Sequence, residues 1–386
     1  MIDSGKGTSR DVGIYIHIPY CKKKCHYCDF LSFLLPCGNE AADYIMGVKK
    51  ELQLLAPRIE NAKAGSLYFG GGTPSLLPLQ YFREIVSAVK EQVLLSPFVE
   101  FTVEANPGTL SRENLRGMVS LGVNRLSLGV QSMNDRLLRS MGRLHTAEEA
   151  REAFYLAREE GMENISIDLM HGLPGQTLDD WRTTLEAVIG LNPEHISVYG
   201  LNLEPNTVWG DLYLDGELEL PGEDECGKMY RMSRKVLQEA GFLQYEISNY
   251  ARPGYECRHN LGYWYRRPYL GIGLGASSFI QGTRYKNYSD PGKYLQALDQ
   301  DVLPIAEKEE LSEKQAISET MFLGLRTAKG INQVEFTRQF GRSIDDIFTP
   351  VLQPLEKAGV IIREGQWLRL NPEYYAVSNE VFQKFV

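Results

Sequence analysis

The sequence lacks any long hydrophobic run. No stretch of its 386 residues approaches the ~18 apolar residues needed to span a bilayer. Its first ten residues are polar and have no apolar core of the kind found in a secretory signal. We therefore expect a cytoplasmic protein, in a compartment where thiols stay reduced.

Positive charge is also scarce. The 41 Lys and Arg residues are outnumbered by 50 Asp and Glu residues, which gives a formal net charge of −9. A protein that coats nucleic acid carries a basic face, so nucleic acid is not an expected partner. The balance still leaves room for a local basic pocket that binds an anionic ligand.

Cysteines are few, and their distribution is uneven. The six cysteines are residues 21, 25, 28, 37, 226 and 257. Three lie within eight residues, which suits a cofactor site better than a disulfide framework in a reducing compartment. The C-x-x-C-H motif of covalent haem attachment is absent. Cys37 and Cys226 have no assigned role and are expected to be small buried hydrophobic residues.

The cysteine triplet comprises Cys21, Cys25 and Cys28, with the spacing C-x3-C-x2-C. Three thiolates bind three irons of a [4Fe–4S] cluster and leave the fourth iron without a protein ligand, where the amino and carboxylate groups of S-adenosylmethionine can bind. A structural zinc site with His17 or His26 as fourth ligand is the alternative. Zinc usually takes its ligands in two separated pairs, and the sequence has no second pair. The spacing therefore favours the cluster.

Six runs rich in apolar and β-branched residues recur along the first half of the chain. They cover residues 13–18, 66–69, 99–104, 125–130, 165–170 and 196–201. Stretches with helical period separate them; one begins at Thr146, where Glu149 completes a capping box, and another at Thr177. Strands that alternate with helices predict an α/β fold with a parallel sheet. In such folds functional residues gather beyond the carboxyl ends of the strands.

From about residue 305 the pattern changes. Ser312 and Gln315 form a capping box that predicts a helix, and two short apolar runs near the C-terminus predict a small hairpin. We therefore divide the chain into a domain over residues 1–304 and a winged-helix-like α+β module over residues 305–386. The module carries 10 Lys and Arg against 12 Asp and Glu residues. A structural cap or lid is thus expected rather than a DNA-binding domain.

The cysteine triplet, together with the glycine-rich segment 69–75 (Phe-Gly-Gly-Gly-Thr-Pro-Ser), resembles the radical S-adenosylmethionine superfamily. From about Tyr15 to the C-terminal module the chain is similar to the family that comprises oxygen-independent coproporphyrinogen III oxidase (HemN) and the haem chaperones (HemW). This resemblance implies a partial (β/α)6 radical S-adenosylmethionine barrel, followed by a C-terminal module like that of HemN.

The resemblance also implies which residues bind S-adenosylmethionine. They are Tyr15, Tyr27, Gly71, Gly72, Thr73, Glu104, Gln131, Arg143 and Asp168. Among them, the glycine loop would bind the methionine amino group and Arg143 the methionine carboxylate. Gln131 would contact the adenosyl part and Asp168 the ribose. Most of these residues follow successive predicted strands, so we expect them to meet at one edge of the sheet.

Three features resemble the haem chaperones more than the oxidases. Only about twenty residues precede Cys21, Asp29 and Phe30 follow Cys28 where the oxidases usually have another cysteine, and residues 258–264 (Arg-His-Asn-Leu-Gly-Tyr-Trp) resemble a His-Asn-x-x-Tyr-Trp motif of haem-binding HemW proteins. An imidazole can ligate haem iron, which makes His259 the candidate haem ligand.

Two alternatives to His259 as the haem ligand stay open. In one, His259 is a hydrogen-bonded polar residue among the core aromatic residues Tyr263 and Trp264. In the other, the thiolate of Cys257 is the ligand.

The expected function is therefore that of a haem chaperone. It would carry a [4Fe–4S] cluster and S-adenosylmethionine, bind haem, and hand the haem to an acceptor such as a respiratory haem protein. An electron donor is a further expected partner, and the resemblance is compatible with a homodimer. Two alternatives are radical decarboxylation of coproporphyrinogen III and radical chemistry on another substrate. Whether the protein is an enzyme is left open.

Overall fold

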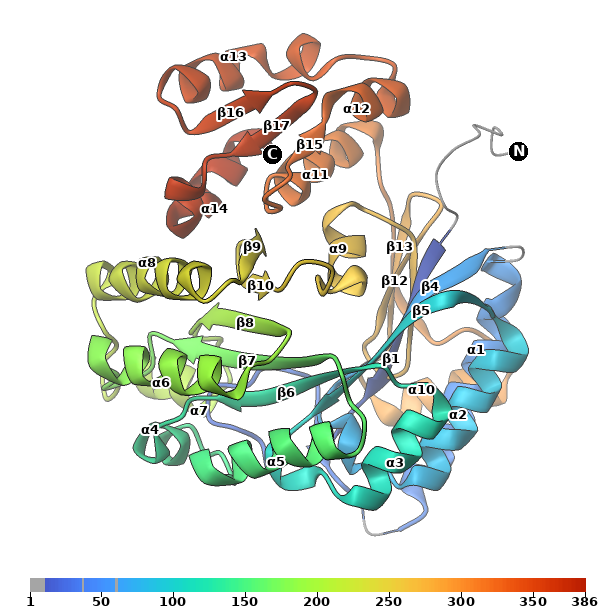
Figure 1. The fold of residues 1–386 in the computed structure, drawn as a ribbon. Coiled ribbons are helices and arrows are strands. Elements are labelled where there is room, and N and C mark those ends of the chain that lie inside the picture. Colours follow the sequence, from blue (N-terminus) through green and yellow to red (C-terminus); the bar gives the residue numbers. More distant parts are fainter. Residues whose placement is uncertain (1–10, 37, 60–61) are drawn as a thin grey trace.

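The structure is a computed structural model that describes residues 11–36, 38–59 and 62–386 (Figure 1). Its main feature is an open sheet of twelve strands. In spatial order these are β14 (Ile305–Glu310), β13 (Thr283–Asn287), β12 (Ser277–Ile280), β11 (Tyr269–Ile272), β1 (Asp11–Ile18), β4 (Lys63–Gly71), β5 (Leu94–Ala105), β6 (Arg125–Gln131), β7 (Ile165–His171), β8 (His195–Gly200), β10 (Asn249–Ala251) and β9 (Leu243–Glu246). Cys37 and the first ten residues, on which the expectation about a secretory signal rests, lie outside the described residues.

The centre of the sheet is parallel. β1 pairs with β4, and β5 to β8 follow in chain order, each parallel to the strand before it. These are the six strands predicted from the sequence, and the prediction is confirmed. Six of the seven residues of β6 are buried, which explains why its sequence is a nearly continuous apolar run. β11 adds a seventh parallel strand on the other side of β1, which the sequence did not predict.

Antiparallel strands extend the parallel centre on both sides. β12, β13 and β14 continue from β11, and β10 and β9 continue from β8. Antiparallel pairs need only short connections, and the pairs β11–β12, β12–β13 and β9–β10 are formed by segments that follow one another closely in the chain. Because β14 still pairs with β13, the chain returns to the large sheet once more before the C-terminal helices. The division of the chain after residue 304 stays a prediction.

Helices cover the sheet, and Figure 1 shows α1, α2, α3 and α5 along one face. The helices up to the end of the sheet are α1 (Glu40–Leu55), α2 (Leu79–Gln92), α3 (Arg112–Leu121), α4 (Asp135–Ser140), α5 (Ala147–Glu159), α6 (Leu178–Leu191), α7 (Val208–Leu214), α8 (Glu223–Glu239), α9 (Arg258–Trp264) and α10 (Pro291–Asp299). Thr146 and Glu149 form the predicted capping box of α5, and Thr177 caps α6. No helix among the described residues is both long enough and apolar enough to cross a membrane.

The C-terminal module has a sheet and a core of its own. Its elements are α11 (Glu313–Gly324), β15 (Ile331–Asn332), α12 (Gln333–Phe340), α13 (Ile344–Lys357), β16 (Ile361–Glu364), β17 (Trp367–Leu370) and α14 (Ser378–Phe382). β17 lies between β15 and β16. The predicted capping box at Ser312 and the predicted hairpin are confirmed. Tyr230 of α8 belongs to the module's core, so the module packs on the helices above the sheet (Figure 1).

The pKa shifts of two buried side chains, His171 and Glu51, predict opposite effects of pH on stability. Burial lowers the pKa of His171 from 6.5 to about 4 and raises the pKa of Glu51 from 4.5 to about 7. The unfolded chain protonates His171 below pH 6.5 while the folded protein does not, so this residue destabilises the fold as the pH falls. The unfolded chain releases the Glu51 proton above pH 4.5 while the folded protein retains it, so Glu51 destabilises the fold as the pH rises.

We therefore expect His171→Leu and Glu51→Gln to change the pH dependence of stability in opposite directions. On going from about pH 7 to about pH 5.5, the free energy of unfolding relative to the unmodified protein should rise by about 1 kcal/mol for His171→Leu and fall by about 1.5 kcal/mol for Glu51→Gln. Denaturant titrations at both pH values measure these differences. If the three proteins respond to pH in parallel, the two pKa shifts are wrong.

Candidate functional site

The cysteine triplet lies directly after β1, on the loop that begins with the short strand β2 (Tyr20–Cys21), which pairs with β3 (Phe33–Leu34). All three thiols are half-buried. The Sγ atom of Cys21 lies 3.5 Å from Oγ1 of Thr73, and Nη1 of Arg143 donates a hydrogen bond of 3.6 Å to Sγ of Cys25. The pKa of the Cys28 thiol is raised to about 11, mainly by burial and to a smaller extent by Cys25 and Cys21. The loop therefore faces residues that follow β4 and β6.

The arrangement of the thiols suits a cluster better than a single ion. Among the described residues, no three His, Cys, Asp or Glu side chains converge on one metal position. A cubic cluster does not need such convergence, because each thiolate binds a different iron. Of the two candidate fourth zinc ligands, His17 has both ring nitrogens bonded, to Tyr15 and to the Leu31 carbonyl oxygen. His26 bonds the Ser140 carbonyl oxygen through Nδ1. The donor set on this loop thus fits a [4Fe–4S] cluster.

Five side chains, two of them triplet cysteines, form a hydrogen-bonded ring with the backbone of the triplet loop. From Cys21 the ring passes through Thr73 to Asn106, whose Nδ2 donates to Thr73 Oγ1 at 2.9 Å. Nη2 of Arg143 then donates to Asn106 Oδ1 at 2.5 Å, and Nη1 returns to Cys25. The structure therefore brings together loops that follow β4, β5 and β6. Asn106 is a site residue that the sequence analysis missed; its position directly after the third predicted strand was the available signal.

Arg143 is placed to receive an anion. Its guanidinium contacts Asn106, the Gly129 carbonyl oxygen and Cys25, but no carboxylate of the described residues forms a salt bridge with it. Its buried Nε atom has no hydrogen-bond partner among the described residues. A buried guanidinium with free donors favours a carboxylate ligand, because unpaired buried charge is costly. Gln131 lies nearby and adopts φ 70, a left-handed conformation that is uncommon outside glycine and often found at functional sites.

The glycine loop after β4 is tied to Glu104. Gly71 has φ 111, and its amide donates to Oε2 of Glu104 at 3.0 Å, while the hydroxyl of Tyr68 donates to Oε1 at 2.8 Å. A Cβ atom on Gly72 would lie 2.7 Å from the Tyr20 carbonyl oxygen, so only glycine lets this loop approach β2. Burial raises the pKa of Glu104 to about 7.

The remaining residues expected at this site lie around the same edge. Asp168 on β7 accepts hydrogen bonds from Ser127 at 2.9 Å and Ser166 at 3.3 Å, and its charge helps to raise the pKa of Glu104. Tyr27 packs against Trp209, with ring centroids 6.1 Å apart. Burial raises the pKa of Tyr27, which also interacts with Arg143. Their roles as S-adenosylmethionine ligands stay predictions.

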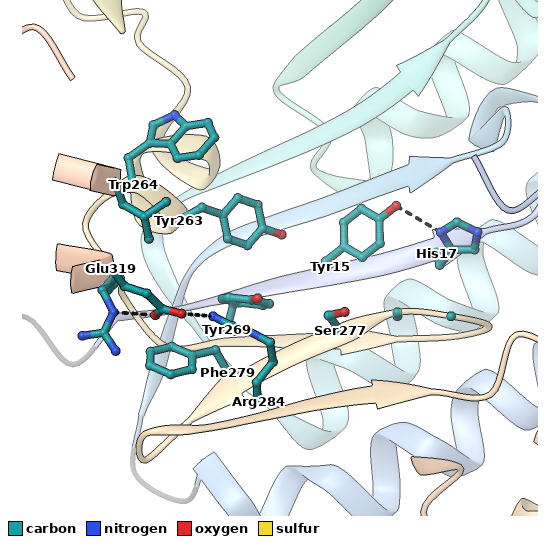
Figure 2. Close-up of a pocket in the computed structure, with 13 residues that line it drawn as sticks. Tyr15, His17, Tyr263, Trp264, Tyr269, Ser277, Phe279, Arg284 and Glu319 are labelled. Atoms are coloured by element: carbon teal, nitrogen blue, oxygen red, sulfur yellow. Dashed lines mark hydrogen bonds and ion pairs between the residues drawn. The ribbon is translucent and has the colours of Figure 1, made fainter. Parts of the chain in front are cut away.

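A cavity of about 460 Å³ lies beside β1, on the side where β11 pairs with it (Figure 2). It is lined by Tyr15, His17, Tyr263, Trp264, Arg266, Tyr269, Gly275, Ala276, Ser277, Phe279, Arg284, Glu319 and Leu323. The walls come from β1, β11 to β13, the end of α9, and α11 of the C-terminal module. Tyr15 also stacks on Tyr68, with ring centroids 6.1 Å apart, and Tyr68 bonds Glu104. The Tyr15–Tyr68 pair therefore links the cavity wall to Glu104.

His259 lies behind the wall of this cavity rather than on it. Its ring is buried, with Nδ1 2.8 Å from Ser66 Oγ and Nε2 2.8 Å from the Tyr263 hydroxyl. Burial lowers the pKa of His259 to about 3, so the ring is neutral at neutral pH. To ligate haem iron, His259 would have to exchange its bond with Tyr263. Its assignment as the haem ligand stays a prediction.

Two further observations bear on the haem ligand. Cys257 is fully buried and contacts Glu100, and burial raises its pKa to about 12; a thiolate is therefore disfavoured there. His17, by contrast, lies on the cavity wall. Sequence reasoning missed the cavity residues on β11 to β13 and α11, because these elements lie outside the six predicted strands.

The chain is similar to known proteins over nearly its whole length. Residues 15–188 match the model of the radical SAM superfamily, and residues 311–373 match that of the HemN C-terminal domain. The chain is 37% identical over 373 residues to "Heme chaperone HemW" of Bacillus subtilis (strain 168), which covers 96% of this chain and 98% of that protein. The chain belongs to the HemW family.

A second member of the HemW family, from Escherichia coli (strain K12), is 38% identical over 296 residues, or 74% of this chain and 77% of that protein. Among solved structures, the radical SAM enzyme coproporphyrinogen III oxidase (HemN) from Escherichia coli matches with a TM-score of 0.86 and 22% identity, over 98% of this chain and 90% of that chain. The likeness to HemN shows the fold, and the predicted fold class is confirmed.

Proposed function

We propose that this protein is a haem chaperone that binds haem in the aromatic cavity between β11 to β13 and α11 and transfers it to an acceptor haem protein. The observation that carries the proposal is the cavity itself. Its volume of about 460 Å³ lies in the range of small-molecule sites, and aromatic rings line it. Tyr263 and Trp264 of the His-Asn-x-x-Tyr-Trp motif stand on its wall. Relatives named heme chaperones support the proposal.

We further propose that Cys21, Cys25 and Cys28 hold a [4Fe–4S] cluster with S-adenosylmethionine on its open iron. When bound, this pair supplies one-electron reductive chemistry at the sulfonium. Arg143 would bind and orient the methionine carboxylate, and the glycine loop, held by Glu104, would contact the amino group. An electron donor and an acceptor haem protein are the further partners that this proposal requires. A cytoplasmic location and a homodimer stay predictions.

The test offers the anaerobically reconstituted and reduced protein either haem or coproporphyrinogen III, with S-adenosylmethionine present. We expect stable haem absorbance bands and no release of carbon dioxide. Carbon dioxide release with formation of protoporphyrinogen would overturn the proposal in favour of the oxidase activity. Failure to bind haem, together with S-adenosylmethionine cleavage on another compound, would favour a radical enzyme with a different substrate.

A further inference from the structure

Two arginines on the wall of the aromatic cavity share one glutamate. Figure 2 labels this glutamate, Glu319, and one of the arginines, Arg284. Nε of Arg266, just after α9, donates to Oε2 of Glu319 at 3.0 Å, and Nη2 of Arg284, on β13, donates to Oε1 of the same residue at 2.7 Å. Glu319 belongs to α11 of the C-terminal module. The three side chains thus join the barrel side of the cavity to the module.

The charges of this group do not balance inside the cavity. Of the side chains on its wall that are charged at neutral pH, two are arginines and one is a glutamate, while burial lowers the pKa of His17 and keeps it neutral. The side chains of Arg266 and Glu319 are only 9% and 13% exposed. Glu309 contacts Arg284 at 3.2 Å, but from outside the cavity wall and with half of its side chain exposed. On the wall itself two arginines face one glutamate, and solvent screens the exposed Glu309 more than the buried pair. This end of the cavity therefore favours an anionic ligand.

The backbone conformation of Arg266 places its guanidinium on the cavity wall. Arg266 adopts φ 50, a left-handed conformation that costs a non-glycine residue free energy. This turn ends α9 and places the guanidinium over the ring of Phe279, 5.2 Å from its centroid. Nη2 of Arg266 makes no hydrogen bond among the described residues, whereas Nε and Nη1 bond Glu319 and Thr320. Donors therefore remain available for a second carboxylate.

We propose that Arg266 and Arg284 form a carboxylate-binding subsite for a planar aromatic ligand with acidic side chains, and that Glu319 occupies this subsite until the ligand arrives. The ligand class is a tetrapyrrole dicarboxylate. Aromatic rings of the cavity wall contact its macrocycle, and the two guanidiniums pair with its carboxylates, for which their fork geometry is suited. The inference rests on the proposed function, because it takes haem to be the occupant of the cavity.

A consequence is that the ligand and the C-terminal module compete for the same arginines. When ligand carboxylates replace Glu319, α11 loses its ion pairs with Arg266 and Arg284. The module keeps other contacts, including Arg326 stacked 4.3 Å from the Trp264 centroid and the hydrogen bond from Ala328 N to the Tyr245 carbonyl oxygen. Ligand binding thus loosens α11 without detaching the module.

The test compares haem with haem dimethyl ester, in which both carboxylates are capped, by absorbance titration of the reconstituted protein. We expect the ester to bind the unmodified protein about tenfold more weakly than haem.

Arg284→Gln should weaken haem binding by about tenfold and leave ester binding unchanged. Glu319→Gln should strengthen haem binding by about fivefold, because the competing carboxylate is gone, and should leave ester binding unchanged. Arg112→Gln is the matched control: Arg112 also bridges two glutamates, on the outer surface.

The outcomes separate this inference from the proposed function. If the unmodified protein binds neither haem nor the ester, the proposed function fails. If it binds haem and the ester equally well, and Arg284→Gln changes neither affinity, the carboxylate subsite is wrong while haem binding stands. If Glu319→Gln binds haem more weakly than the unmodified protein does, the proposed competition between Glu319 and the ligand carboxylates is wrong. The ester comparison uses no substitution, so it does not depend on any variant folding.

Discussion

Replacing Cys21, Cys25 and Cys28 together by alanine is expected to abolish iron binding and the brown absorbance after anaerobic reconstitution. The three thiols lie on one half-buried loop, and a [4Fe–4S] cluster needs all of them when the fourth iron has no protein ligand. No thiol elsewhere in the described chain is placed to replace them: Cys257 is fully buried against Glu100. Iron content and the visible spectrum measure the result.

Cys226→Ala is the matched control for the triple variant. Its thiol is also partly exposed, but it lies on α8 and its nearest partner is the Pro221 carbonyl oxygen. We expect this variant to bind as much iron as the unmodified protein. Full iron retention in the triple variant would overturn the cluster assignment, whereas equal losses in both variants would point to a general instability of the reduced chain.

Replacing His259 by alanine is expected to weaken haem binding by at least about tenfold while leaving the cluster intact. If its imidazole is the iron ligand, the loss removes a coordination bond and shifts the haem absorbance bands. Because Nε2 is held by the Tyr263 hydroxyl, Tyr263→Phe frees this nitrogen and should preserve the ligation bands. Absorbance titration and iron content together measure both effects.

A comparison of His259→Ala with Tyr263→Phe distinguishes iron ligation by His259 from a packing role in the cavity wall. Loss of haem in both His259→Ala and Tyr263→Phe would mean that the hydrogen-bonded pair shapes the wall and that neither residue is specifically the ligand. Unchanged affinity in His259→Ala would remove His259 from the site. A His17→Gln variant then tests the imidazole that does stand on the cavity wall.

Local sequence determined the elements of this protein that depend on short-range patterns. The six parallel strands were predictable because strands buried on both faces are continuous apolar runs, as in β6. Capping boxes at Thr146 and Ser312 marked helix starts, because they need only a side chain and a backbone group three residues away. The cysteine triplet was readable for the same reason: its three ligands lie on one loop.

Only the tertiary structure determines which residues that are distant in the chain contact one another. The hydrogen-bonded ring from Cys21 through Thr73, Asn106 and Arg143 to Cys25 joins loops that follow three different strands. The position of Asn106 after a predicted strand was a signal, but its bonds to Thr73 and Arg143 depend on long-range packing. The sequence likewise proposed His259 as a haem ligand, but packing places its ring behind Tyr263, with both nitrogens bonded. The aromatic cavity exists because β11 to β13 and α11 fold back beside β1. Arg266, Arg284 and Glu319 are far apart in the chain, so only long-range packing could bring one carboxylate between two guanidiniums.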